Sequence, residues 1–185
     1  RPELSTKQRK VLSYYDNATL YNDSIVAQIV NRFRNENAIV IYVPDHGEEC
    51  YEENRGFICR NHSAQIDWPL AHYEFEIPFW IYCSQKYIRT HRDIYRQIRA
   101  AKDKRYMTDA LPHLLLYLAG IETPTYREEY NILSPKYNEM RPRILKNSAD
   151  YDKLRDEHIA KEKAKEEAKE AQTKKNKKKK GNKKK

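Results

Sequence analysis

Apolar residues form two continuous runs in this chain, and polar residues bound each of them. The first run covers 38–43 (AIVIYV), stops at Pro44 and is followed by Asp45 and His46; the second covers 77–83 (IPFWIYC). An uninterrupted β-branched run is typical of a parallel strand that is covered on both faces. Ligands of such sheets gather at the carboxyl ends of the strands. We therefore expect the functional residues at Asp45 and His46.

Other segments repeat apolar residues at helical spacing. The first, 16–33, has Asp16 as its predicted N-cap, and a polar break at 35–37 separates it from the first apolar run. A helix that leads into a strand is half of a βαβ unit, so it implies a preceding strand. The segment 85–104 mixes apolar and basic positions, which predicts an amphipathic surface helix.

A further helix is predicted after Thr108 or Asp109, either of which can serve as its N-cap. Pro112 falls in its first turn, 114–118 (LLLYL) supplies a core face, and Gly120 marks its end. These start and stop signals make its two boundaries well defined.

The remaining segments lack such periodicity. The composition of 44–73 predicts a long irregular segment, and loops of this length are usually either functional or disordered. The composition of 121–150 predicts an extended arm that wraps over the domain. A charged helix is expected over about 151–171, followed by a disordered lysine run. We therefore predict one folded domain at 1–150 and a charged tail at 151–185.

The positive charge of the chain is concentrated at one end. Of 36 Lys and Arg residues and 27 acids, 13 Lys and 4 acids lie in 161–185, which leaves 23 of each sign in 1–160. A nucleic-acid-binding domain is expected to carry a basic stripe on its folded surface. The neutral balance of the folded part therefore argues against a nucleic-acid partner.

No apolar run is long enough to predict a transmembrane helix, and the first residues, RPEL, do not resemble a signal peptide. Because the sequence begins at Arg1, we expect it to be a piece of a longer protein or a processed product. Cys50 and Cys59 lie in one predicted loop. They would form a disulfide in an oxidising compartment, and two buried or free thiols are an equal alternative.

Asp45 and His46 together offer a hard oxygen and an imidazole nitrogen, which suit Zn²⁺ or Mn²⁺ better than Ca²⁺. A structural salt bridge or hydrogen bond is the competing interpretation, and the dipeptide alone favours neither. Gly47 follows at once, and a glycine permits a sharp turn and a close approach of the backbone to a ligand. That position favours the metal site.

The order of these motifs resembles a known family over roughly residues 12–122. Tyr15-Asp16-Asn17 at a helix, an apolar strand, Asp45-His46-Gly47-Glu48, a His-bearing loop and Ile77-Pro78-Phe79-Trp80 follow one another. This order resembles the C-terminal half of the catalytic domain of lipid A phosphoethanolamine transferases, within the sulfatase and alkaline phosphatase superfamily. The resemblance implies an α/β fold, a three-layer α/β/α sandwich that is alkaline-phosphatase-like and present only as its C-terminal part.

The resemblance also implies a set of site residues. Asp45 and His46 would be zinc ligands, with Mn²⁺ as an alternative metal, and His62 would contact the phosphoryl group. Glu48 belongs to the same motif and would support a ligand from outside the ligand set. Among the other histidines, we expect packing roles for His91 and His113. His72 is expected to be structural or exposed, with a place in the lining of the site as the alternative. A solvated acidic loop is expected at Glu48, Glu49, Glu52 and Glu53.

In the family reaction, a Thr alkoxide attacks the phosphorus of a phospholipid donor, and phosphoethanolamine then passes to a lipid A or glycan acceptor. The resemblance implies an inner-membrane protein with its catalytic domain in the periplasm. The nucleophilic Thr and the membrane anchor are expected upstream of this chain, because Thr19 and Thr108 lack the family context. We therefore expect the isolated chain to be inactive and to bind zinc poorly.

Two other function classes stay open at this point. A sulfatase-type or phosphodiesterase hydrolase would share Asp45 and His46 but pass the group to water. A non-catalytic binding protein could keep the fold and use its polybasic tail. That tail is either a solvated end or a segment attracted to anionic lipid phosphates, which would aid membrane association.

Overall fold

The structure is a computed structural model that describes residues 1–59 and 65–181. Its elements, in chain order, are α1 (Thr6–Arg32), β1 (Ile39–Tyr42), β2 (Glu49–Cys50), η1 (Glu52–Asn54), β3 (Phe57–Cys59), α2 (Trp68–Phe75), β4 (Trp80–Cys83), α3 (Gln85–Thr90), α4 (Arg92–Ala101), η2 (Thr108–Ala110), α5 (Leu111–Ala119), η3 (Glu128–Tyr130), β5 (Ile144–Leu145), β6 (Ala149–Asp150) and α6 (Tyr151–Gly181). No helix in these two ranges combines the length and the apolar character needed to cross a bilayer.

The two apolar runs form a pair of neighbouring strands, β1 and β4. They are antiparallel, with Ile39 opposite Cys83 and Tyr42 opposite Trp80, and the Tyr42 and Trp80 rings stack at 5.1 Å. The prediction of a parallel strand buried on both faces is wrong for this pair, because every β1 residue is only partly buried. A continuous apolar run specifies a strand but not the direction of its partner.

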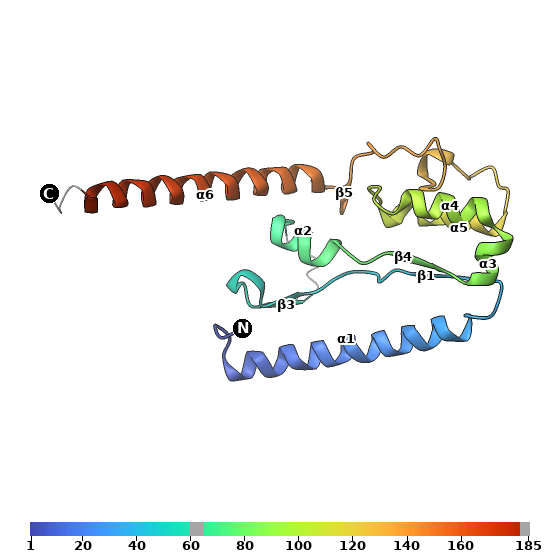
Figure 1. The fold of residues 1–185 in the computed structure, drawn as a ribbon, viewed down its shortest axis with the longest axis horizontal. Coiled ribbons are helices and arrows are strands. Elements are labelled where there is room, and N and C mark those ends of the chain that lie inside the picture. The colour runs from blue at the N-terminus through green and yellow to red at the C-terminus, as the bar shows by residue number, and fades with distance from the viewer. Residues whose placement is uncertain (60–64, 182–185) are drawn as a thin grey trace.

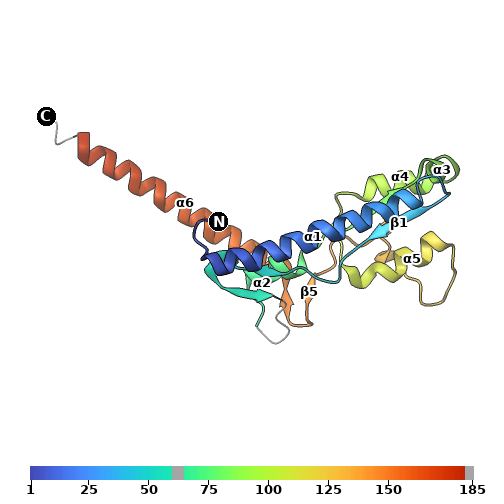
Figure 2. The same cartoon turned by 90° about the horizontal axis from the view of Figure 1, so that it is seen from below.

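Helices lie on both sides of the β1–β4 pair (Figures 1 and 2). α1 runs along one side, and α4 and α5 lie on the other, which gives the order helix, sheet, helix (Figure 1). On the α4 and α5 side, Phe79 and Ile81 pack against a cluster that surrounds the fully buried Leu114. Together with the residues packed against it, this cluster is the larger of the two hydrophobic cores found among the described residues, and it fixes β4 to the helices that follow it.

α1 begins ten residues earlier than the sequence pattern predicts. Ser5 caps it, because its Oγ accepts a hydrogen bond from the Gln8 backbone N–H while the Gln8 side chain accepts one from the Ser5 N–H. This reciprocal pair is a capping box. The predicted apolar face is present, but none of its side chains is buried, and Leu20 and Ile29 are exposed.

The helix predicted over 85–104 is divided into α3 and α4. The break lies at His91, whose φ of −128° and ψ of 52° are not helical. The Thr90 hydroxyl contacts His91 Nδ1 at 2.8 Å, and the His91 ring stacks on Tyr87 at 4.3 Å. His91 therefore has the structural role expected from the sequence.

The segment 44–73 is more ordered than predicted, since it contains the short β2–β3 hairpin and the helix α2. Asp67 caps α2, with its Oδ1 accepting from the Leu70 N–H at 3.1 Å. Leu70 and Tyr151 belong to the second hydrophobic core, which joins α2 to the beginning of α6. α6 itself continues to Gly181, beyond the predicted end at about residue 171.

The α5 prediction is confirmed. Pro112 lies in the first turn, and Gly120 ends the helix in the left-handed conformation at φ 65°. The 3-10 turn η2 precedes the helix, and α5 has no side-chain N-cap. The segment 121–150 consists mostly of turns and irregular backbone, with the 3-10 turn η3 and the short β5–β6 hairpin, so it is less extended than predicted.

Candidate metal centre

The loop after β1 places Asp45 and His46 side by side. The His46 backbone N–H donates to Asp45 Oδ1 at 3.1 Å, and His46 Nε2 lies 3.4 Å from Asp45 Oδ2. The Asp45 side chain is 82% exposed, so it lies at the surface of the molecule. The two predicted site residues therefore lie together at the end of β1.

The spacing of these two atoms fits a shared metal ion. Tetrahedral zinc with ligand bonds of about 2.0–2.1 Å separates two ligand atoms by about 3.3–3.4 Å. His46 Nδ1 lies 2.8 Å from the Gly47 carbonyl oxygen, and a proton on Nδ1 donated to it leaves the Nε2 lone pair beside Asp45. Within 1–59 and 65–181, no three His, Cys, Asp or Glu residues are grouped to hold a metal. Asp45 and His46 therefore offer two donor atoms side by side, and their role as metal ligands stays a prediction.

Gly47 fastens this loop to α2. Its backbone N–H donates to the Glu74 carbonyl at 2.8 Å, and a Cβ at position 47 would lie 2.2 Å from the Tyr73 carbonyl oxygen. Real Cβ atoms do not approach backbone oxygens this closely, so only glycine fits without movement. The close approach predicted from the sequence is therefore made to the chain itself.

Of the four acidic residues predicted to form a solvated loop, Glu53 is exposed, whereas Glu48, Glu49 and Glu52 are largely buried. Glu49 is fully buried and forms an ion pair with Arg55 Nε at 2.8 Å. Burial raises the pKa of the Glu49 carboxyl, and this effect exceeds the opposing influence of Arg55. Glu52 accepts from the Cys50 backbone N–H and from Arg1. These carboxylates stabilise the β2–β3 hairpin.

Glu48 is mostly buried and directed toward the imidazole. Its Oε1 lies 3.9 Å from His46 Nδ1, and its Oε2 is a buried atom with no hydrogen-bond partner among the described residues. Glu48 also lines a polar cavity of about 500 Å³ between α1 and the β2 segment, together with Tyr15 and Asp16. Its position beside His46, outside the Asp45–His46 pair, is compatible with the supporting role expected for it.

The remaining predicted residues are distributed as follows. His62 lies in 60–64, outside the described residues, so its role stays a prediction. His72 is on α2, where it stacks on Trp68 at 5.5 Å and contacts Glu76 at 2.9 Å. His113 on α5 accepts the Arg127 backbone N–H at 3.2 Å. Both therefore have structural partners, as the sequence predicts.

The two cysteines of the predicted loop belong to opposite strands of the β2–β3 hairpin. Cys50 is buried in β2, and Cys59 in β3 pairs with Glu49. A bridge between them depends on the Cys59 side chain, which is outside the described residues. The disulfide therefore stays a prediction.

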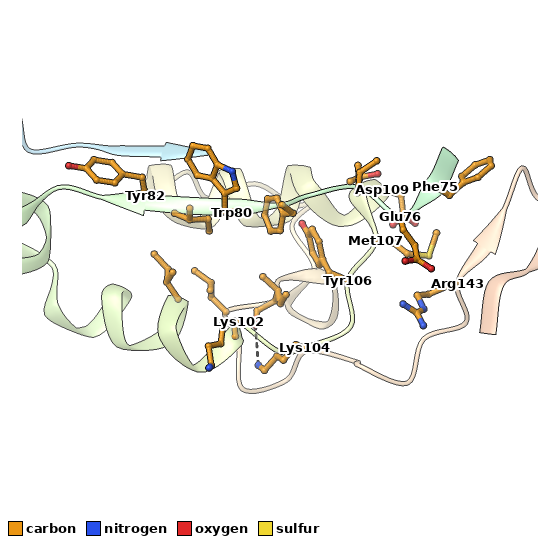
Figure 3. Close-up of a pocket in the computed structure, with 18 of the residues that line it drawn as sticks. Phe75, Glu76, Trp80, Tyr82, Lys102, Lys104, Tyr106, Met107, Asp109 and Arg143 are labelled. Atoms are coloured by element: carbon orange, nitrogen blue, oxygen red, sulfur yellow. Dashed lines mark hydrogen bonds between the residues drawn. The ribbon is translucent and has the colours of Figure 1, made fainter. Parts of the chain in front are cut away.

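A large cavity begins at Asp45 and extends beneath β4 (Figure 3). Its volume is about 1120 Å³, and residues from five separate segments line it. Sequence reasoning missed Tyr106 and Arg143, both of which Figure 3 shows at this cavity. Neither belongs to a recognisable motif, because the cavity is assembled from parts of the chain as much as 106 positions apart, from Asp45 to Tyr151.

Comparison with known proteins gives consistent matches. Residues 1–121 match the Sulfatase family model. Phosphoethanolamine transferase EptC of Escherichia coli (strain K12) is 32% identical over 141 residues, which cover 75% of this chain and 23% of that protein. Kdo(2)-lipid A phosphoethanolamine 7''-transferase of the same organism is 31% identical over 80 residues, covering 43% of this chain and 13% of that protein.

The fold is also similar to a solved structure. The crystal structure of the C-terminal periplasmic domain of EcEptC from Escherichia coli, in complex with Zn, aligns with a TM-score of 0.66 and 30% identity. The alignment covers 83% of this chain and 43% of that domain. The match confirms the predicted alkaline-phosphatase-like α/β fold class, present here as part of a domain.

The matches cover different shares of this chain and of its relatives. This chain spans about a quarter or less of the length of the curated relatives it matches. The family model, in contrast, covers well over half of the chain, from α1 to the end of α5. The protein therefore belongs to the sulfatase family and is similar to its phosphoethanolamine transferases.

Proposed function

We propose that this chain supplies the C-terminal part of the catalytic domain of a phosphoethanolamine transferase. The complete enzyme would move phosphoethanolamine from a phospholipid donor to a lipid A or glycan acceptor. The observation that carries the proposal is the pairing of Asp45 Oδ2 and His46 Nε2 at 3.4 Å, at the end of the strand where the family motif begins. The similar proteins of known activity support the same reaction class.

Zinc is the metal that this donor pair fits best, and one related domain has been solved in complex with Zn. When bound, the ion would act as a Lewis acid at the phosphoryl oxygens and lower the pKa of the attacking hydroxyl. Asp45 and His46 would hold it, while Glu48 would support the imidazole and His62 would contact the phosphoryl group. Gly47 keeps the pair at a fixed place relative to α2.

The experiment uses the complete enzyme and two conservative variants, Asp45→Asn and His46→Gln. We expect each to lower phosphoethanolamine transfer at least about 100-fold, because removing a metal ligand disturbs both metal binding and charge stabilisation. Bound zinc, measured by mass spectrometry, should fall in parallel. Asp103→Asn is the matched control, since Asp103 is as exposed as Asp45 and lies outside the site. Full transfer activity in Asp45→Asn would overturn the assignment.

The isolated chain should show no turnover, because the nucleophilic Thr is expected in another part of the enzyme. The check is release or transfer of phosphoethanolamine from a labelled phospholipid by this chain alone, with added zinc. Turnover that survives repurification would show that the nucleophile is in this chain. Thr19, on α1, and Thr108, at the first position of η2, would then be the residues to replace.

A hydrolase of the same fold is the second candidate, and the match to the Sulfatase model favours keeping it. The two reactions differ only in the final acceptor, so product analysis of the complete enzyme distinguishes them. A transferase yields an acceptor that carries phosphoethanolamine, whereas a hydrolase yields free phosphoethanolamine at the same rate without any acceptor.

The proposed substrates place the enzyme at a membrane. We infer an inner-membrane enzyme with its catalytic domain in the periplasm, as the name of the solved relative's domain suggests. The lysine-rich end of α6 would aid contact with anionic lipid, because each Lys near such a surface contributes about 1 kcal/mol. The neutral balance of residues 1–160 leaves this segment as the main source of attraction.

A further inference from the structure

One side of α1 is an uncharged stripe that faces solvent. Tyr14, Ala18, Tyr21, Ile25 and Ile29 follow one another at intervals of four, three, four and four residues, so they share one face of the helix. All five are exposed, and Tyr21 is 70% exposed. These residues, here called the outer stripe, extend over ~22 Å at ~1.5 Å per residue. In Figure 1, no element of the described ranges lies beyond α1 on the side away from β1.

The packing of α1 within this chain uses another side of the helix. Val26 and Val30 are partly buried. At ~100° per residue they are turned by about 100–140° from Ile25. Folded proteins rarely leave a contiguous apolar patch uncovered unless it is an interface. The outer stripe is therefore available for a partner without any change in how α1 packs here.

The strand β1 has an open edge. Within the part of the chain that the structure describes, its only paired strand is β4. The Ser84 N–H donates to the Ala38 carbonyl oxygen, so hydrogen-bonded pairs alternate with unbonded pairs from that position. Val40 is therefore bonded to β4, whereas the N–H and C=O groups of Ile39 and Ile41 point away from it. An edge without charged side chains is a template for a further strand.

We propose that the outer stripe of α1 and the open edge of β1 are covered by the part of the catalytic domain that this chain does not contain. The alignment with the solved relative covers 43% of that domain, so more than half of it is available to extend the sheet and to pack on α1. A second copy that paired stripe to stripe would leave the edge of β1 open. The inference rests on the proposed function in one respect, namely that a larger catalytic domain includes this chain.

The first test compares hydroxyl-radical oxidation of Tyr21 in the complete enzyme and in the 185-residue chain, measured by mass spectrometry. The chain is used at a concentration at which light scattering shows a monomer. Oxidation of Tyr21 should be at least fivefold slower in the complete enzyme, because its ring is removed from solvent there. Met140, which is 78% exposed, is the internal control and should change less than twofold. Equal rates for Tyr21 in the two proteins would overturn the proposal.

The second test identifies what covers the outer stripe. The photoreactive p-benzoylphenylalanine replaces Ile25 in the complete enzyme, and crosslinked peptides are mapped by mass spectrometry after irradiation. We expect crosslinks to residues of the same catalytic domain that lie outside the 185 residues. The same replacement at Arg96, whose side chain is 76% exposed on α4, is the control and should give few crosslinks. Crosslinks from position 25 to a second copy, seen at twice the mass, or to a membrane segment would overturn the proposal.

The third test examines the edge of β1 at single amides by hydrogen exchange. The amides of Ile39 and Ile41 should exchange at least 100-fold more slowly in the complete enzyme than in the 185-residue chain, because both would gain hydrogen bonds to a further strand. The amides of Val40 and Tyr42, which are bonded to β4, are the matched control and should change less than tenfold. Unchanged exchange at Ile39 and Ile41 would overturn the proposal. Because these measurements need no turnover, they fail independently of the Asp45 activity test.

Discussion

Gly47 is the residue at which the candidate metal loop meets the rest of the fold. We expect Gly47→Ala to lower the free energy of unfolding by about 1–3 kcal/mol, because its Cβ would overlap the Tyr73 carbonyl oxygen. Urea unfolding followed by circular dichroism measures the change. Gly120→Asn is the control, since no atom lies near a Cβ there and Asn tolerates φ 65°. Equal midpoints for wild type and Gly47→Ala would contradict the contact.

Asp152 joins the beginning of α6 to three arginines. Arg143 donates to Asp152 Oδ1 at 2.5 Å, Arg105 also contacts this carboxylate, and Arg155 lies 3.4 Å from it. The Arg143 hydrogen bond, followed by the charges of the arginines, holds the pKa of the Asp152 carboxyl below its usual range. The folded state therefore binds this proton less readily than the unfolded state does.

This linkage predicts a pH dependence of stability. The contribution of Asp152 is fully present above the unfolded pKa, near 4, and is lost as pH falls toward the lower folded pKa. We expect Asp152→Asn to cost about 1–2 kcal/mol at neutral pH and to flatten stability below about pH 5. Urea unfolding over this range measures both effects. Asp156→Asn, at a more exposed carboxylate, should change neither.

At the scale of elements, the sequence predicted the boundaries of a helix where residues within the helix itself set them. Pro112 and Gly120 fix the ends of α5, because each residue acts through its own backbone. The start of α1 also has a local signal, the capping box of Ser5 and Gln8. It was missed because the sequence before Asp16 has no apolar periodicity that would predict a helix there. The break at His91 and the direction of β1 depend on tertiary packing, which no local pattern specifies.

In the candidate site, too, some features follow from the local sequence and others depend on tertiary packing. The position of Asp45 and His46 near the end of a strand and before a glycine was predictable from the apolar run, whereas their role as metal ligands stays a prediction. The contact between Gly47 and the α2 backbone was not, because α2 is eight residues long and its pattern is too short to identify. Tyr106 and Arg143 reach the cavity through long-range folding alone.

The lysine-rich end of α6 leads to a prediction at this scale. Deletion of 161–185 removes a net charge of +9, so partition onto phosphatidylglycerol vesicles should fall at least tenfold at low salt. The vesicle binding that remains after the deletion should depend little on salt concentration, because the deleted lysines supplied the electrostatic attraction. Phosphatidylcholine vesicles are the control surface. Sedimentation with vesicles that gives equal binding for both chains would exclude a role of this segment.

At the scale of the whole molecule, α1 covers the β1–β4 pair but leaves its own apolar side chains exposed. Leu20 is 69% exposed and Ile29 45% exposed, and no residue of α1 is buried. We expect Leu20→Lys with Ile29→Lys to change the free energy of unfolding of this chain by less than about 0.5 kcal/mol. The same pair should reduce self-association measured by light scattering, because an exposed apolar stripe is removed.

Leu114→Ala is the contrasting variant for this experiment. Leu114 is fully buried in the larger core, so its truncation should cost about 2–5 kcal/mol. A large destabilisation by the α1 pair in this chain would show that α1 is packed more tightly than its exposure indicates. In the complete enzyme, a loss of stability from the α1 pair would show that another part of the protein covers this face.

The backbone hydrogen bond between Gly47 and Glu74 has a consequence for local unfolding. It ties the metal loop to α2, and α2 in turn shares a core with α6, where the Tyr151 hydroxyl donates to Glu76 at 2.5 Å. These segments should therefore open together as one cooperative unit. A ligand held by the loop should slow amide hydrogen exchange in α2 and the first turns of α6 while leaving α5 unchanged. The occupied site would then be detectable as protection far along the chain from Asp45.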